Sequence, residues 1–212
     1  MSELRRLRRA GGGAIRLLVD LLPDDWDPRS GAEDVCLMFA DISGYSAFVA
    51  DGGDDDAMAL LAVLDQQVER ALAGRRGSRV VKRLGDGLMV ALRSSGDALD
   101  AAVTMVEGFD AAAAARGWPV RLRAGVHRGT TRRQADDYFG YHVNLTARIV
   151  ETAGGGQVLA TANVLAGVDL PALTITARPA GELTAKGVTG PVDLFLVERL
   201  GQPDHGWGRL AG

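Results

Sequence analysis

Two aspartates stand where apolar runs meet glycines. Asp41 follows the apolar run 35–40, and Asp86 lies between two glycines, just ahead of a second apolar run at 88–92. Aspartate is a poor strand former, so we interpret an acid at such a point as held there for chemistry. Two carboxylates brought together would suit Mg²⁺, which takes one or two protein carboxylates and fills its remaining positions with phosphate oxygens and water. The pattern predicts a two-metal nucleotide site.

Four further polar residues could contact a nucleotide. Lys82 stands four residues before Asp86, in the same segment. Asn144 and Arg148 are four residues apart, so on a helix they share one face, and arginine suits a bidentate phosphate contact. Lys186, in a loop ahead of a strand, could meet phosphates as a mobile point charge. Each has an ordinary alternative, a solvated surface side chain, so none of them decides the function alone.

The segments that must position these residues alternate between strand and helix patterns. A tight hairpin turning at 85–87 lies between two helices and requires antiparallel pairing; in its first strand, strict alternation would put Val80, Lys82 and Leu84 on one face. The order predicts an α+β fold, a ferredoxin-like βαββαβ antiparallel sheet with helices on one face plus a C-terminal αβ extension. The expected strands are 35–40, 79–84, 88–92, 120–127, 157–160, 173–178 and 192–199. One helix is expected to start near Ser43, and further helices are expected over 54–73, 96–115, 141–153 and 161–166.

Composition indicates an ordinary globular protein. The 212 residues fit one domain with extensions. A hydrophobic content of 47% and a net charge of −3 argue against disorder and against general nucleic-acid binding. The lone cysteine, Cys36, lies in an apolar run and predicts a buried thiol in a reducing, cytoplasmic location. The longest apolar stretch is shorter than the ~20 residues that cross a bilayer.

Five segments together resemble the catalytic domain of the class III adenylate and guanylate cyclases, over about Asp34 to Arg199. Each segment is a weak signal, but all five occur in family order at family-like spacing. They are Phe39-x-Asp-Ile-x-Gly-Tyr45, Lys82-x-x-Gly-Asp86, Arg123-x-Gly-Val-His-x-Gly129, Asp137-x-x-Gly-x-x-Val-Asn-x-x-x-Arg148 and Lys186-Gly187.

The resemblance implies an adenylate cyclase of the short-arm bacterial subgroup. Such an enzyme converts ATP to 3′,5′-cyclic AMP and pyrophosphate by in-line attack of the ribose 3′-hydroxyl on the α-phosphate. Asp41 and Asp86 resemble the metal-binding aspartates, which hold two Mg²⁺ or Mn²⁺ ions per site. Lys82 and Asp137 would read adenine, and Asn144 would orient the ribose. Arg148 would stabilise the transition state, and Lys186 would bind the triphosphate.

The same resemblance implies a homodimer. In this family one domain supplies the metal aspartates and its head-to-tail partner supplies the base-reading pair, the asparagine and the arginine. This chain holds both sets, so two shared sites are implied and a monomer should be inactive. Seven residues separate Gly129 from Asp137, a short version of the arm that many members use in dimer contacts.

The implied organisation has three parts. Residues 1–33 would form a basic and apolar helix with a linker, 34–200 the catalytic domain, and 201–212 a tail. Within the first part, residues 4–22 would cap the domain or contact an anionic membrane surface or a regulatory partner. No nucleic-acid partner is expected.

Two other interpretations carry less weight. The chain could be a catalytically silent nucleotide-binding or dimerisation module, but none of the implied catalytic residues is missing. The stretch 52–56, Gly-Gly-Asp-Asp-Asp, resembles the GGDEF signature of diguanylate cyclases. That signature belongs on the central hairpin turn, whereas 52–56 precedes a helix, where acids favour the N-terminal dipole.

Overall fold

The computed structural model describes residues 31–201. The predictions for the segment 4–22 and for the tail lie outside the described residues. Within this part an eight-stranded sheet runs in the order β2-β3-β1-β4-β6-β8-β7, with β5 paired to β4. The elements are β1 (Ala32–Ser43), α3 (Tyr45–Leu72), β2 (Arg79–Leu84), β3 (Gly87–Leu92), α4 (Ser95–Ala114), β4 (Arg121–Gln134), β5 (Asp137–Phe139), α5 (Tyr141–Thr152), β6 (Val158–Thr161), α6 (Ala162–Leu165), η1 (Pro171–Leu173), β7 (Ile175–Leu183) and β8 (Val192–Arg199).

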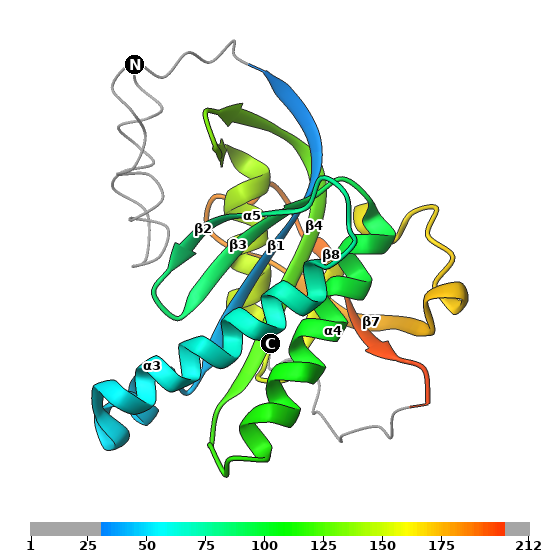
Figure 1. Cartoon of the computed structure of the whole chain (residues 1–212). Coiled ribbons are helices and arrows are strands. Elements are labelled where there is room, and N and C mark those ends of the chain that lie inside the picture. The colour runs from blue at the N-terminus through cyan, green and yellow to red at the C-terminus, as the bar shows by residue number, and fades with distance from the viewer. Residues whose placement is uncertain (1–30, 202–212) are drawn as a thin grey trace.

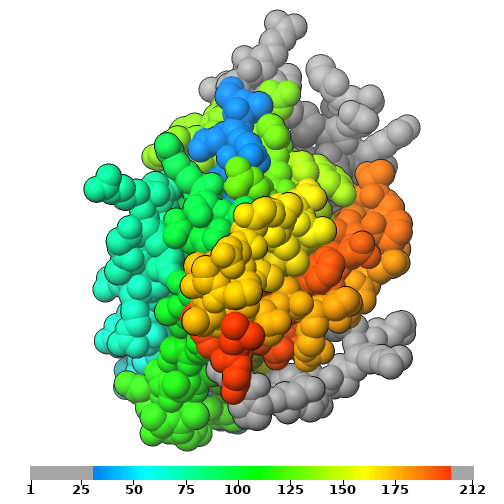
Figure 2. All heavy atoms as spheres, turned by 90° about the vertical axis from the view of Figure 1, so that its right-hand side faces the viewer, coloured from blue at the N-terminus to red at the C-terminus, as the bar shows by residue number. Residues whose placement is uncertain are grey.

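The first six elements form the predicted ferredoxin-like core. β1 pairs antiparallel with both β3 and β4, and β2 pairs antiparallel with β3. The remaining strands extend the sheet beyond β4, through a parallel β4–β6 pair and antiparallel β6–β8 and β8–β7 pairs. This extension, coloured yellow to red, covers one edge of the molecule (Figure 2). The fold class is confirmed.

The sheet is covered on both faces. The long helices α3 and α4 pack on one face, as predicted for the core, and α5 of the extension packs on the other (Figure 1). Successive residues of β1 therefore face opposite helices: Met38 points toward α3 and α4, and Phe39 toward α5. Double coverage explains why the run 35–40 is apolar without alternation, and all six of its residues are buried.

Several local features differ from the sequence prediction. β1 is longer than the expected 35–40 by three residues at each end, and β7 runs over Ile175–Leu183 where 173–178 was expected. The two helices expected near Ser43 and at 54–73 form the single element α3, interrupted at Gly53, whose φ of 79° is not helical. β4 runs seven residues beyond its expected end, because its second half pairs with the start of β1 and with β5. The short strand β5 had not been predicted. No helix within residues 31–201 is long and apolar enough to cross a membrane.

Candidate active site

Strand pairing brings Asp41 and Asp86 together. In the β1–β3 ladder Asp41 lies opposite Gly87, so the hairpin turn places Asp86 beside it. A Cβ atom on Gly87 would lie 3.1 Å from the carbonyl oxygen of Ala40 and 3.5 Å from Asp41 Oδ1, so the lack of a side chain permits this close approach. Burial, and after it the negative charge of Asp41, raises the pKa of Asp86. The structure therefore brings the two carboxylates close enough for the charge of one to act on the other.

Arg123 of β4 holds Asp41 from the other side. Its Nε and Nη2 both donate to Asp41 Oδ2, at 3.0 and 2.5 Å. Its Nη1 donates to the carbonyl oxygens of Glu151 and Ala153, at 3.3 and 3.1 Å, where α5 ends. Sequence reasoning quoted Arg123 only as part of a motif and gave it no role. Its pairing opposite Asp41 in the β1–β4 register would have been the signal.

The donor set of this corner fits a divalent cation. Asp41 and Asp86 supply hard carboxylate oxygens, and the half-buried Asp86 has no ion-pair partner among residues 31–201. Within that range no group of three or more His, Cys, Asp or Glu side chains could hold a metal. An ion bound here would take its other ligands from phosphate and water, which is the usual arrangement for Mg²⁺.

Lys82 and Asp137 form an ion pair across 55 positions of sequence. Lys82 Nζ lies 2.6 Å from Asp137 Oδ2. A β-bulge between Val80 and Lys82 interrupts the alternation of β2, so the prediction that these two share a face is wrong. Beyond the bulge Lys82 pairs with Met89, whose side chain packs on the face of the sheet that α5 covers. The bulge therefore turns the lysine to the side of the sheet where Asp137 lies.

The carboxylate of Asp137 is fixed at both oxygens. Oδ2 accepts from Lys82, and Oδ1 accepts from the backbone N–H of Tyr138 at 2.7 Å. The ammonium of Lys82 also lies 5.7 Å from the ring centroid of Phe139. β5 supplies Asp137, Tyr138 and Phe139. The arrangement presents one cationic donor next to one anionic acceptor, partly open to solvent.

Helix α5 carries Asn144 and Arg148 on a half-buried stripe. The buried residues Val143 and Ala147 of the same helix pack against the sheet. Arg148 Nη1 donates to Glu151 Oε2 at 2.5 Å. Its Nε is buried and finds no acceptor among the described residues. The guanidinium thus has donor capacity that the chain itself leaves unused.

A pair of neutral histidines supports the start of α5. His127 of β4 is buried; its Nε2 lies 2.8 Å from His142 Nδ1 and its Nδ1 lies 2.8 Å from Thr161 Oγ1. Burial, with the charge of His142 second, lowers the pKa of His127 to about 4, and burial also lowers the pKa of His142. Both rings are neutral at pH 7 and act as hydrogen-bonding supports.

Lys186 is carried by the loop at 184–191, far along the sequence from the other predicted site residues. It is exposed in the loop between β7 and β8 and makes no hydrogen bond or ion pair among the described residues. The loop is tied to α5 because the N–H of Thr189 donates to Tyr141 Oη at 3.3 Å. Ala185 and Val188 of the same loop pack against buried apolar residues of α5, β6, β7 and β8.

The predicted site residues fall into two sets within one chain. Asp41 and Asp86 lie beside the C-terminal end of α5, through Arg123, whereas Asp137 lies just before the N-terminal end. A 12-residue helix is about 18 Å long. In the described part of the chain no hydrogen bond or ion pair joins the two acids to Lys82 or to Arg148.

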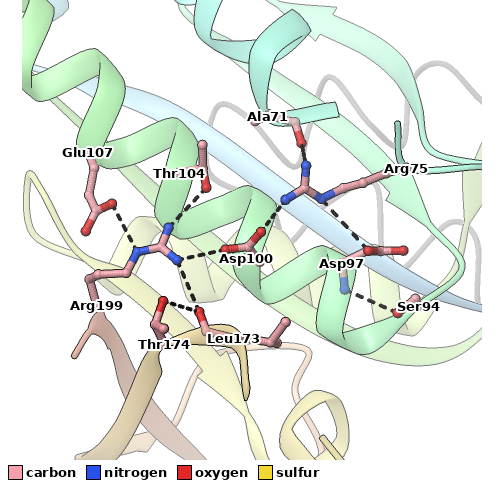
Figure 3. A network of polar contacts seen from close by, with 10 residues as sticks. All are labelled: Ala71, Arg75, Ser94, Asp97, Asp100, Thr104, Glu107, Leu173, Thr174 and Arg199. Atoms are coloured by element: carbon pink, nitrogen blue, oxygen red, sulfur yellow. Dashed lines mark hydrogen bonds and ion pairs between the residues drawn. The ribbon is translucent and has the colours of Figure 1, made fainter. Parts of the chain in front are cut away.

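A second charged cluster lies on α4, on the opposite face of the sheet (Figure 3). Arg199 donates to Asp100 at 2.9 Å and to Thr104 at 3.1 Å, and it pairs with Glu107. Arg75 bonds the other oxygen of Asp100. The cluster ties β8, α4 and the end of α3 together, and we interpret it as structural.

Residues 28–199 match the family model described as the adenylate and guanylate cyclase catalytic domain. The chain belongs to this family. An uncharacterized protein of Mycobacterium tuberculosis is 36% identical over 158 residues, covering 74% of this chain and 39% of the relative. A pH-sensitive adenylate cyclase of the same species is 30% identical over 184 residues, covering 81% and 42%. The chain spans about two fifths of the length of these curated relatives.

Solved cyclase structures share the fold. A structure of adenylate cyclases from Trypanosoma brucei in their monomeric state aligns with a TM-score of 0.69 at 23% identity, covering 88% of this chain and 96% of that one. The adenylyl cyclase CyaB from P. aeruginosa gives 0.63 at 22%, covering 84% and 98%. A guanylate cyclase domain from Catenaria anguillulae in complex with GTP gives 0.62 at 19%, covering 79% and 97%. Since both kinds of cyclase match, the choice of base depends on the residues of this chain.

Proposed function

We propose that the protein is an adenylate cyclase, which converts ATP to 3′,5′-cyclic AMP and pyrophosphate. The observation that carries the choice of ATP is the 2.6 Å contact between Lys82 Nζ and Asp137 Oδ2 within a cyclase fold. An ammonium can donate to an acceptor nitrogen of adenine, while a carboxylate accepts from its exocyclic amine. On guanine these groups are reversed, so the pair would face mismatched polar groups, and this mismatch would disfavour GTP.

Asp41 and Asp86 would hold two Mg²⁺ or Mn²⁺ ions. When bound, such ions lower the pKa of the attacking ribose hydroxyl and offset the charge of the phosphates. Arg123 bonds Asp41, and Gly87 lets the turn approach β1 closely.

Arg148 would place positive charge where negative charge develops at the α-phosphate. Loss of one such preorganised donor typically costs ~10²–10³ in rate. Its Nη1 bonds Glu151, and its buried Nε, which has no acceptor among the described residues, could donate to a phosphate oxygen. Asn144, one turn earlier, would orient the ribose, and Lys186 would bind the triphosphate from its exposed loop.

The active unit in this proposal is a head-to-tail homodimer with two shared sites. Each site would combine the aspartates of one chain with Lys82, Asp137, Asn144 and Arg148 of the other. Among residues 31–201 of one chain, no hydrogen bond or ion pair joins the two aspartates to Lys82 or Arg148, and this supports the arrangement. A monomer would be inactive.

The remaining proposals concern organisation and location. Residues 34–200 would form the catalytic domain, between the N-terminal segment 1–33 and the tail 201–212. Cys36 is a buried free thiol, which fits a reducing, cytoplasmic compartment. The segment 4–22 would contact a membrane surface or a regulatory partner.

A cyclase assay tests the proposal. The purified full chain is incubated with ATP or GTP and Mn²⁺ or Mg²⁺ over a series of protein concentrations. We expect cyclic AMP from ATP, much less cyclic GMP from GTP, and a specific activity that rises with protein concentration. No cyclic AMP at high protein concentration would overturn the proposal and favour a silent nucleotide-binding module.

A further inference from the structure

Arg79, at the start of β2, contacts both chain neighbours of Asp137. Its Nη1 donates to the backbone carbonyl of Asp136 at 2.7 Å, and its guanidinium lies 5.1 Å from the ring centroid of Tyr138. We propose that Arg79 is a positioning residue of the base-reading pair, which holds β5, and with it Asp137, where that carboxylate can read adenine together with Lys82. This inference rests on the proposed adenylate cyclase function and adds to it a residue that controls the choice of base.

The β-bulge in β2 brings Arg79 and Lys82 to the same face of the strand. In a regular strand, residues three positions apart point to opposite faces. The bulge between Val80 and Lys82 shifts the register, so that Arg79 pairs with Ala91 and Lys82 pairs with Met89. Both of these partners pack on the face of the sheet that α5 covers. The bulge therefore turns two cationic side chains toward β5.

The hairpin of β4 and β5 depends on such contacts for its position. β5 pairs with β4 over three residue pairs, and the β1–β4 ladder ends at Arg132, so the hairpin tip extends past that ladder. A two-stranded ribbon is marginally stable by itself. Lys82 ties the tip to β2 through the carboxylate of Asp137, which adenine would engage in our proposal. Arg79 ties it through a backbone carbonyl that reads no base, so this contact would persist when the nucleotide binds.

The surroundings of Arg79 make it suitable for this task. Its hydrogen bond joins a charged donor to a carbonyl oxygen, and such bonds are stronger than those between neutral groups. Its Nη2 is buried and has no acceptor among the described residues, so the guanidinium is not a freely solvated surface group. The ring of Tyr138 is itself buried in the apolar cluster that α5 covers. Arg79 therefore joins β2 to fixed points on both sides of Asp137.

Two simpler roles for Arg79 predict different results. As a surface charge, it would attract the triphosphates of ATP and GTP equally. As a structural link alone, its loss would lower stability without changing the choice of base. Arg83 provides the matched control, because it lies on the same strand and pairs with Asp65 of α3. Its ladder partner, Leu88, packs on the face of the sheet that α3 and α4 cover. Loss of Arg83 therefore removes the same charge from β2 without affecting β5.

The test measures binding of 3′-deoxy-ATP and 3′-deoxy-GTP to the full chain with Mn²⁺, by isothermal titration calorimetry. Both analogues lack the attacking hydroxyl, so binding is separated from chemistry. Arg79→Met should weaken 3′-deoxy-ATP binding about 10-fold and 3′-deoxy-GTP binding by less than about 2-fold. In turnover, KM for ATP should rise by a similar factor, while kcat changes by less than about 3-fold. Arg79→Lys keeps the charge and a donor, so its loss of 3′-deoxy-ATP affinity should be about 3-fold. Arg83→Met should match the wild type.

An unchanged ratio of the two affinities in a folded Arg79→Met variant would overturn the inference, whether both affinities stay the same or both fall equally. If that variant fails to fold, Arg79→Lys decides, and a wild-type ratio there would contradict the positioning role. Wild-type protein that makes cyclic AMP, with a base preference that does not depend on Arg79, would overturn this inference alone. Wild-type protein that prefers 3′-deoxy-ATP through Arg79 and makes no cyclic AMP would overturn the proposed function alone.

Discussion

Two charged regions of this protein use aspartate and arginine in different ways. On α4, Asp100 has both oxygens bonded by arginines, Oδ1 by Arg199 and Oδ2 by Arg75 (Figure 3). At the end of β1, Asp41 has one oxygen bonded by Arg123, and Asp86 has no ion-pair partner among residues 31–201. A closed network binds secondary structure elements to one another, whereas an open one has ligand capacity to spare. In our proposal, the region whose carboxylates keep ligand capacity to spare is the one that serves a substrate.

The arginines differ in the same way. Arg199 uses Nε, Nη1 and Nη2 within the chain, on Glu107, Asp100 and Thr104. Arg148 uses only Nη1, on Glu151, and its buried Nε has no acceptor in the described part of the chain. Unpaired buried donors carry a desolvation cost, which a phosphate oxygen would relieve.

The largest expected loss of activity follows a change at Asp86, which has no ion-pair partner among residues 31–201. Asp86→Asn should lower cyclic AMP formation by about 10³-fold or more, because the metal contribution amounts to several kcal/mol and each 1.36 kcal/mol is a factor of ten. The melting curve should stay cooperative. Initial rates with saturating ATP and Mn²⁺ measure the change. Retention of more than a tenth of the activity would remove Asp86 from the site.

A smaller loss is expected at the base-reading pair. Lys82→Glu combined with Asp137→Cys should lower kcat/KM for ATP by at least about 10²-fold, since the pocket would then present the wrong donors and acceptors. The ratio of kcat/KM for ATP and GTP measures the change. Unchanged ATP turnover would refute the adenine-reading role of both residues.

A change in the closed network on α4 should lower the stability of the protein and leave its catalytic rate unchanged. Asp100→Asn should lower the free energy of unfolding by about 1–3 kcal/mol, because it weakens charged hydrogen bonds to two arginines. Urea denaturation measures the loss, and kcat per folded molecule should be unchanged. A large fall in kcat with unchanged stability would contradict our distinction between the two regions.

The smallest effect is on the stability of the metal-free protein. Burial raises the pKa of Asp86 above its unfolded value, so its ionised form is disfavoured in the folded state. This cost is present at pH 7 and disappears as the pH falls through the folded pKa toward the unfolded one. Asp86→Asn should therefore raise the melting temperature at pH 7 in the presence of a chelator, and the gain should vanish near pH 3.5. A lower melting temperature at pH 7 would show that Asp86 already has a partner.

The features that sequence could predict are those set by neighbouring residues. The hairpin at 79–92 and the helices α4 and α5 occur within about one residue of their expected bounds, because alternation, helical spacing and the glycines act locally. Asp41 lies inside β1, two residues before its end, and Asp86 lies in the turn between β2 and β3. Their approach followed from the β1–β3 register, which the predicted antiparallel core makes natural.

What sequence could not predict depends on distant pairing. The bulge before Lys82 reverses the alternation, and it is visible only in the β2–β3 register. β5 is three residues long and exists because β4 continues past its predicted end. Arg123 gained its contacts with Asp41 from the β1–β4 register. The partnership of Lys82 with Asp137 came from the family resemblance, and no local pattern links residues so far apart.

Mixing two inactive variants tests the central claim of a shared site most directly. Asp41→Ala disables the metal-binding aspartates, and Arg148→Ala disables the residues that the partner chain contributes. Each variant alone should be inactive. In an equimolar mixture, half of the dimers would be mixed and each would hold one intact site, so about a quarter of wild-type activity should return. No recovery, with both variants folded, dimeric and exchanging subunits, would contradict the shared site.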